Sequence, residues 1–159
     1  MSYTLIPLTR GKNAKIDSAD YQRGSAFPWH FNGRGYAVRK AWVPGGRGLR
    51  VNVFLHRFLL DAPQHLGVDH VNGDTLDNRR SNLRLATQSQ NLANRRVRRN
   101  ASGFRGVYRH GSRWQAQIKQ NGKQKHLGMF AKKLDAAKAY NRAARTAFGS
   151  FATLNDIPR

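Results

Sequence analysis

The chain contains no cysteine and no glutamate, so its only acidic residues are eight aspartates among 159 residues. The lack of cysteine excludes disulfide bonds, thiolate zinc sites and a thiol nucleophile. Its apolar runs are only a few residues long, far too short for a membrane-spanning helix. The N-terminal residues show neither the basic leader nor the apolar core of a signal peptide. We therefore expect a soluble protein that acts in the cytoplasm.

Positive charge is what the chain has in excess. Its 29 lysines and arginines give a formal net charge of +21. Such a charge destabilises a compact fold by self-repulsion unless a polyanion neutralises it, so nucleic acid is the first candidate partner. An anionic membrane surface ranks much lower, because no long basic helix with a strong apolar face dominates the chain. No protein partner and no dimerisation heptad is evident, so we expect a monomer.

The composition changes along the chain. Residues 1–94 hold 13 Lys and Arg against 6 Asp, whereas residues 95–159 hold 16 against 2. The border is a basic, nearly apolar-free segment that we interpret as a linker, which gives an N-terminal domain at 1–94, a linker at 95–102 and a C-terminal domain at 103–159. The linker is either a solvated loop or a basic arm along phosphates, and its four arginines favour the arm. These arginines are Arg95, Arg96, Arg98 and Arg99.

The patterning predicts an α+β fold. Short strand-like runs separated by Gly, Pro, Asn and Asp fill the N-terminal region, with a hairpin turn at Gly45–Gly48. A short helix is expected from His56 to Pro63. Thr87 is expected to cap another helix, with Gln90 completing a capping box. Further on, the pattern predicts a three-stranded antiparallel sheet packed on one helix, with strands at 104–109, 113–120 and 123–130 and the helix at 132–149.

The residues of the C-terminal strands alternate between two faces. Trp114, Ala116 and Ile118 are expected to face the helix, while Gln115, Gln117 and Lys119 face away from it. On the next strand, Gln124 and His126 would share that outer face if Leu127 and Met129 are buried. The outer face would then carry amides and cations, which can read bases and hold phosphates.

The stretch from Val68 to Asn82 concentrates the scarce acids, with three aspartates inside nine residues. Asp69 offers a carboxylate suited to a hard divalent ion. The adjacent His70 can take a proton from water near neutral pH. Asn82 and Asn91 follow 12 and 21 residues after His70 and could ligate a metal or orient the histidine. The alternative is that these residues only form a turn rich in Asp and Asn and have no catalytic role.

A family resemblance favours a catalytic role for these residues over a purely structural turn. Several segments together resemble the signature of HNH endonucleases, most closely the homing enzymes encoded by phages and introns. They are His56-Arg57, Val68-Asp69-His70, Asn72-Gly73-Asp74, Leu76-Asp77-Asn78-Arg79-Arg80, Asn82-Leu83-Arg84 and Ser89-Gln90-Asn91.

The resemblance implies a ββα-metal motif at about residues 55–94 that binds one divalent ion, Mg²⁺ with Mn²⁺ as a possibility. It gives Asp69 and Asn91 the role of metal ligands and His70 the role of general base. Asn82 would orient that histidine or its surroundings. Asp74, Asp77 and Asn78 are assigned to loop structure, and His56 to structure in preference to substrate contact.

The C-terminal domain resembles the DNA-binding domain of plant ethylene-response factors. The likeness lies in Gly103–Val107, Trp114–Ile118, His126–Phe130, Ala136–Tyr140 and Phe148-Gly149, although Tyr108 and His126 depart from residues common in that family. It implies a sheet laid in the major groove of double-stranded DNA. The expected DNA contacts, by position, are Arg105, Arg109, Gln115, Gln117, Lys119 and Gln124.

Together these patterns predict a metal-dependent endonuclease that nicks or cleaves duplex DNA, encoded by a phage and acting in a host cell. A DNA-binding transcription regulator with an inactive nuclease fold is the alternative. A third, weaker hypothesis is nonspecific packaging of nucleic acid by charge alone.

Overall fold

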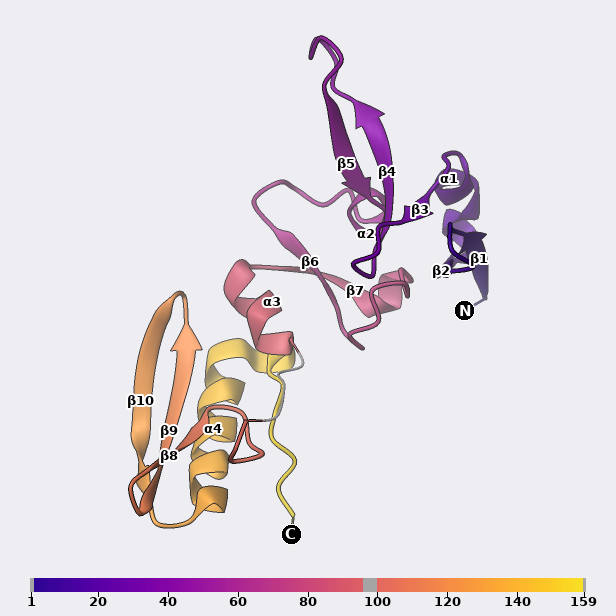
Figure 1. Cartoon of the computed structure of the whole chain (residues 1–159). Helices are drawn as coiled ribbons and strands as arrows, with labels where there is room; N and C mark the ends of the chain where they lie inside the picture. Colours follow the sequence, from indigo (N-terminus) through magenta and orange to yellow (C-terminus); the bar gives the residue numbers. More distant parts are fainter. Residues whose placement is uncertain (1, 96–99, 159) are drawn as a thin grey trace. The chain divides into compact units, whose positions relative to one another are not determined.

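The structure of the chain is a computed structural model that describes residues 2–95 and 100–158 (Figure 1). The predicted contact residues Arg96, Arg98 and Arg99 lie outside the described residues. The contacts divide the chain into two compact units, residues 1–86 and residues 87–159. The domain limits drawn from composition stay a prediction.

The first unit is rich in strands. Its elements are β1 (Tyr3–Pro7), β2 (Asn13–Asp17), η1 (Ser18–Asp20), α1 (Tyr21–Ser25), β3 (His30–Phe31), β4 (Ala37–Trp42), β5 (Arg50–Phe54), α2 (Leu55–Leu59), β6 (Gly67–His70), η2 (Arg80–Asn82) and β7 (Leu83–Ala86). The strands form three antiparallel sheets with the orders β1-β2, β3-β4-β5 and β6-β7. The expected strand-rich region is therefore confirmed.

The core of the first unit follows from simple periodicities. Ala14 and Ile16 are two residues apart on β2 and are both fully buried, as expected for one face of a strand. Leu55 and Leu59 are one helical turn apart on α2 and are also fully buried. This core fixes the position of α2, which carries His56.

The predicted hairpin turn at Gly45–Gly48 is confirmed as the connection between β4 and β5. The backbone N–H of Val43 donates to the carbonyl of Leu49 at 3.0 Å, and that of Leu49 donates to the carbonyl of Gly46 at 2.8 Å. Beside the turn, Trp42 lies opposite Arg50 across the two strands. The Arg50 guanidinium is 4.0 Å from the centre of the Trp42 ring system.

The second unit has the predicted sheet and helix. Its elements are α3 (Gln88–Asn94), β8 (Val107–His110), β9 (Arg113–Gln120), β10 (Lys123–Phe130), α4 (Lys133–Phe148) and η3 (Gly149–Phe151), with the sheet order β10-β9-β8. Thr87 caps α3 in a full capping box with Gln90, as predicted. Ala116 and Ile118 of β9 are buried in clusters with Ala137 and Tyr140 of α4, which confirms that one face of the sheet covers the helix.

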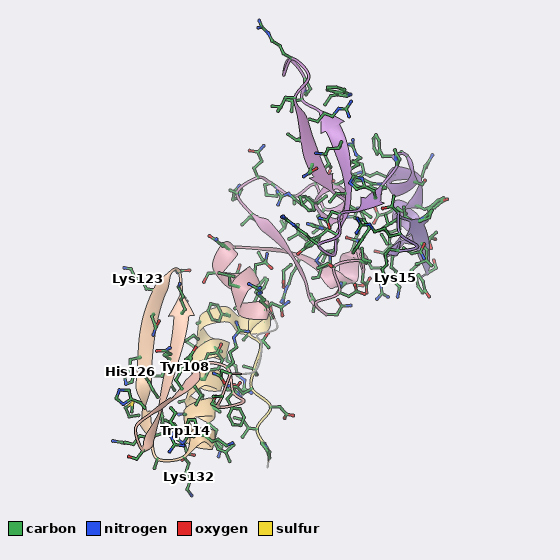
Figure 2. All side chains as sticks on the ribbon, viewed as in Figure 1. Lys15, Tyr108, Trp114, Lys123, His126 and Lys132 are labelled. Atoms are coloured by element: carbon green, nitrogen blue, oxygen red, sulfur yellow. The ribbon has the colours of Figure 1, made fainter. Side chains whose placement is uncertain are left out.

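The outer face of the sheet differs from the expected alternation after His126. His126 pairs with Gln117 and lies on the outer face, and Figure 2 shows it projecting from β10 on the side away from α4. A β-bulge between His126 and Gly128 then shifts the register. Met129 is therefore opposite Gln115 instead of sharing the inner face with Leu127, because a bulge adds one residue to one strand. Gln124 and His126 thus share the outer face, as expected, whereas Leu127 and Met129 are both half-buried and lie on opposite faces.

Within the described residues, no helix is long and apolar enough to cross a membrane.

Candidate active site

The strand pair β6-β7 holds the residues that the sequence analysis placed at the centre of the chemistry. Asp69 and His70 are the last two residues of β6, and they lie opposite Arg84 and Leu83 of β7. Both are buried, with 4% of Asp69 and 5% of His70 exposed. Because neighbouring residues of a strand point to opposite faces, the carboxylate and the imidazole meet different surroundings.

The His70 imidazole lies against other aromatic rings. The centres of the His70 and His56 rings are 5.1 Å apart in an edge-to-face arrangement. The Tyr36 ring centre lies 5.5 Å from that of His56 and 6.3 Å from that of His70. These contacts come from β6, from α2 and from the residue before β4, so the tertiary fold of the first unit confines the ring of His70.

Burial controls the protonation of the two histidines. It lowers the pKa of His56 to about 3, with a smaller contribution from the charge of nearby His70. Burial also lowers the pKa of His70, although its interaction with the Asn78 side chain and the nearby carboxylates of Asp69, Asp74 and Asp77 oppose the shift. His70 is therefore a neutral imidazole at neutral pH, the protonation state that a general base needs.

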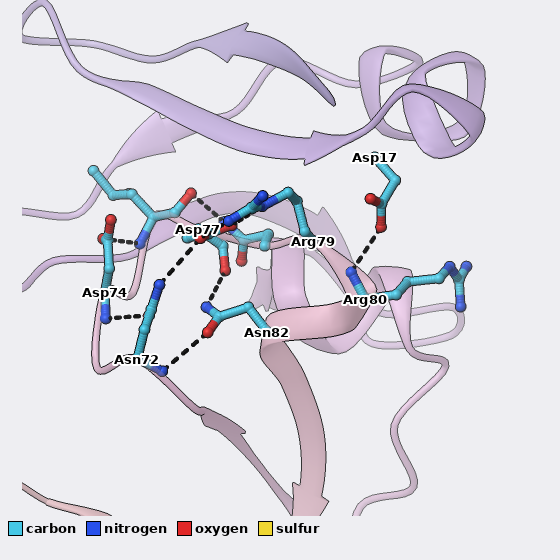
Figure 3. A network of polar contacts seen from close by, with 9 residues as sticks. Asp17, Asn72, Asp74, Asp77, Arg79, Arg80 and Asn82 are labelled. Atoms are coloured by element: carbon cyan, nitrogen blue, oxygen red, sulfur yellow. Dashed lines mark hydrogen bonds and ion pairs between the residues drawn. The ribbon is translucent and has the colours of Figure 1, made fainter. Parts of the chain in front are cut away.

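Asn82 holds the loop that follows His70 (Figure 3). Its side-chain N–H donates to the carbonyl of Asp77 at 2.7 Å, and its side-chain oxygen accepts from the backbone N–H of Asn72 at 3.0 Å. The backbone N–H of Val71 also donates to the carbonyl of Asn82 at 2.9 Å. Asn82 thus organises the surroundings of His70 through the chain that leaves it.

The other polar side chains of the loop form an internal network. The Asp77 carboxylate accepts from Arg79 at 2.7 Å and from the Asn72 side chain at 3.1 Å. Asp74 accepts from the backbone N–H of Leu76 at 3.0 Å. The Asn78 side chain donates to the carbonyl of Leu76 at 3.0 Å. These bonds agree with the loop-building role expected for Asp74, Asp77 and Asn78.

The carboxylate of Asp69 forms an ion pair across the two strands. Its Oδ2 atom accepts from Nε of Arg84 at 2.8 Å and lies 2.7 Å from Nη2 of the same guanidinium. Both side chains are largely buried, with 5% of the Asp69 side chain and 19% of the Arg84 side chain exposed. The guanidinium thus balances the charge of this buried carboxylate.

Asp69 offers a single carboxylate to a divalent ion. In the part of the chain that the structure describes, no group of three or more His, Cys, Asp or Glu residues is placed to hold a metal. A site at Asp69 would therefore need amide, phosphate or water oxygens besides its one carboxylate. Hard divalent ions such as Mg²⁺ use these donors, since Mg²⁺ keeps several waters and binds few protein carboxylates. At the level of donor chemistry, Asp69 fits such an ion.

The remaining predicted residues lie in the second unit. Asn91 is on α3, and its role as a metal ligand stays a prediction. Arg105 donates from its guanidinium to the carbonyls of Leu92 and Arg95, each at 2.8 Å, and so covers the end of α3. A guanidinium bound in this way supports the helix, and a DNA contact by Arg105 would have to share these bonds.

The sheet residues expected to contact DNA gather on the outer face. The Gln115 amide and the His126 ring are 3.0 Å apart, and the Gln124 side chain donates to that of Gln117. Lys119 lies opposite Gln124 and is exposed. Arg109, also exposed, donates to the carbonyl of Gly111 at 3.1 Å. The structure brings most of these residues together, while their contact with DNA stays a prediction.

Sequence reasoning missed two partners of the central residues. Arg84, the cross-strand partner of Asp69, stands within the motif Asn82-Leu83-Arg84 and becomes a candidate only when the register of β6 and β7 is known. Tyr36, whose ring lies near that of His70, comes from a segment 34 residues earlier (70 − 36) and carried no signal of its own.

Comparison with known proteins agrees with this geometry. Residues 61–93 match the HNH endonuclease family. An uncharacterized HNH endonuclease of Acanthamoeba polyphaga mimivirus is 28% identical over 157 residues, which cover 98% of this chain and 81% of the viral protein. An ethylene-responsive transcription factor-like protein of Arabidopsis thaliana is 52% identical over 41 residues, which are 26% of this chain and 18% of the plant protein.

The family match contains Asp69, His70, Asn82 and Asn91, and the viral relative resembles both units. These matches are similarities to HNH endonucleases, and they support a DNA-cleaving hydrolase activity.

Proposed function

We propose that the protein is a metal-dependent endonuclease of the homing type, which nicks or cleaves duplex DNA while its C-terminal sheet docks on that DNA. The observation that carries the proposal is the end of β6. There the buried Asp69, paired with Arg84, is followed by the buried His70, whose pKa is lowered by burial.

In this proposal His70 is the general base. A neutral imidazole accepts a proton from water, and the resulting hydroxide bonds to phosphorus. The bond from phosphorus to one sugar oxygen breaks as it does so, and that leaving oxygen takes up a proton from solvent water. The contact with the His56 ring at 5.1 Å limits the orientations that the His70 ring can adopt. Asn82 fixes the chain after His70 through its bonds to Asn72 and Asp77. These residues prepare the base before substrate arrives, which lowers the cost of reaching the reactive geometry.

Asp69 is the first proposed ligand of a divalent ion, Mg²⁺ or Mn²⁺. When bound, such an ion supplies positive charge that stabilises the extra negative charge on the phosphate and the leaving oxygen. The assignment of Asn91 as a further ligand rests on the family resemblance. Within the protein, Arg84 holds the Asp69 carboxylate in place.

Docking on duplex DNA is assigned to the outer face of the sheet β8-β9-β10. Amides of Gln115, Gln117 and Gln124 can bond to base edges, and Lys119 and Arg109 can bond to phosphates. The bonds among these amides show that they lie within reach of one another. The net charge of +21 draws the chain toward a polyanion.

The similarity to a plant transcription factor-like protein favours a second candidate, a DNA-binding regulator with an inactive nuclease unit. The similarity to a mimivirus protein supports a viral or phage origin, with action in the cytoplasm of a host cell. Under both candidates the protein works on DNA as a monomer and away from membranes.

Cleavage of plasmid DNA tests the choice between these candidates. With Mg²⁺ the wild-type protein should give nicked or linear DNA, and His70→Ala should abolish cleavage because it removes the base. His65→Ala is the matched control, since His65 is exposed and lies outside β6. Binding to labelled duplex in EDTA should be the same for all three proteins.

Two outcomes would overturn the proposal. Cleavage by His70→Ala at the wild-type rate would show that His70 is not the base. Binding that persists with no cleavage under any divalent ion would favour the regulator.

A further inference from the structure

The ion pair between Asp69 and Arg84 occupies the carboxylate that the proposed function gives to a metal. Asp69 and Arg84 are directly opposite in the register of β6 and β7. Two nitrogens of the guanidinium approach the same carboxylate oxygen, Oδ2, at 2.8 and 2.7 Å. The pair is thus built into the strand pairing and does not depend on a chance surface contact.

Physical chemistry explains why a partner is needed there. A carboxylate with 5% of its side chain exposed is costly to keep ionised unless a positive charge or several hydrogen bonds compensate it. Arg84 supplies that positive charge and holds the Asp69 carboxylate in place across the two strands.

The same guanidinium weakens the binding of a divalent ion at Asp69. It uses lone pairs of Oδ2 that a divalent ion would otherwise share, and its fixed positive charge repels a second cation brought to the same carboxylate. Even at the dielectric constant of bulk water, a positive charge a few ångströms from a divalent ion weakens binding of that ion by about tenfold or more.

We propose that Arg84 is a resident counter-cation that sets the metal affinity of the site: it holds the Asp69 carboxylate in an ion pair in the metal-free protein and lowers the affinity of Asp69 for a divalent ion. Arg84 is therefore a positioning residue that acts through Asp69. This inference rests on the proposed function, because it takes Asp69 as a metal ligand.

A second ion pair of the same unit provides a matched control. Asp77 is as buried as Asp69, with 5% of its side chain exposed, and it pairs with Arg79 at 2.7 Å. Arg79, with 33% of its side chain exposed, resembles Arg84 in its bonding, but its aspartate is assigned to the loop and not to the metal. Removing the charge of Arg79 should therefore cost stability and leave metal affinity unchanged.

The test measures metal binding without using cleavage. Full-length protein treated with EDTA and then freed of it is titrated with Mn²⁺ by calorimetry, in the absence of DNA, and its melting temperature is followed with and without Mn²⁺. Arg84→Gln keeps a donor for Asp69 but removes the charge, whereas Arg84→Lys keeps the charge. Arg79→Gln is the control for an equivalent change, and Asp69→Asn identifies the binding event as that at Asp69.

Arg84→Gln should bind Mn²⁺ about tenfold more tightly than the wild type, melt at a lower temperature without the ion, and gain more melting temperature from it. Arg84→Lys should stay within about threefold of the wild-type affinity, because its charge still opposes the ion. Arg79→Gln should lower the melting temperature and keep the wild-type affinity. A role of Arg84 in packing alone would lower the melting temperature without tightening the binding of Mn²⁺.

The outcomes separate this inference from the proposed function. If Asp69→Asn abolishes Mn²⁺ binding but Arg84→Gln binds no more tightly than the wild type, the counter-cation role is wrong and the metal site stands. If no protein binds Mn²⁺ at millimolar concentration, or Asp69→Asn binds as the wild type does, the metal site at Asp69 is itself wrong and the role of Arg84 falls with it. Should Arg84→Gln fail to fold, Arg84→Met gives the same comparison.

Discussion

The buried His56 should make the protein sensitive to mild acid. In the folded chain the pKa of His56 is about 3, because burial disfavours the charged ring, and in an unfolded chain it is 6.5. Between these two pH values the unfolded chain binds a proton that the folded chain does not. The free energy of unfolding should therefore fall as the pH falls from 6.5 toward 3, and this contribution should be lost completely below pH 3.

The size of the effect follows from the gap between the two pKa values. Each pH unit inside the window costs about 1.4 kcal/mol. Lowering the pH from 7 to 5 crosses the part of this window between pH 6.5 and pH 5, about 1.5 pH units. It should therefore reduce the free energy of unfolding by about 2 kcal/mol through His56 alone. Burial lowers the pKa of His70 as well, which adds to the loss in the same direction.

Urea denaturation of metal-free protein at pH 5, 6 and 7, followed by circular dichroism, measures this loss. His56→Gln cannot titrate, so its loss between pH 7 and pH 5 should be smaller than that of the wild type by about 2 kcal/mol. His65→Gln, a change at an exposed histidine, should keep the wild-type loss. Repulsion among the many positive charges grows in acid for all three proteins, so it cancels in the comparison. An equal loss in wild type and His56→Gln would refute the reasoning.

Four further variants test what stabilises the second unit. Gly106 has φ +70°, and a Cβ there would lie 2.2 Å from the Tyr140 ring, so Gly106→Ala should lower the free energy of unfolding by about 3 kcal/mol or more in a urea titration. Gly111→Ala, at φ +58° with no atom within 4 Å of its added Cβ, should cost only about 1 kcal/mol by the same measurement. Thr87→Ala removes the cap of α3 and should cost about 1 kcal/mol, while Thr87→Ser should restore most of the stability.

The sequence predicted the second unit most closely where local rules dominate. Strands β9 and β10 have the predicted bounds, because alternation marks their faces and Asn121-Gly122 makes a tight turn in which both residues have positive φ. The face of the sheet that each residue of β10 occupies after His126 was not predictable in this way. It depends on a bulge at which Gly128 has φ +130°, and a bulge is decided by pairing with β9 and not by the local sequence.

The candidate site shows the same division. The motif around Asp69 and His70 and the cap at Thr87 could be recognised from the sequence, because they depend on neighbouring residues. The pairing of Asp69 with Arg84 depends on the register of two strands, and the contact of His70 with His56 depends on the packing of α2 against β6. Such long-range contacts leave no periodic signal in one sequence.

The ion pairs change the meaning of the aspartates that are concentrated beside His70. Three aspartates in nine residues suggest an acidic patch, which would repel a DNA backbone. In the structure the two buried carboxylates are each neutralised, Asp69 by Arg84 and Asp77 by Arg79. Asp74 uses its carboxylate to accept from the backbone of Leu76. Because a neutralised pair presents little net charge, the loop need not repel phosphate, and the excess of cations elsewhere in the chain can still attract DNA.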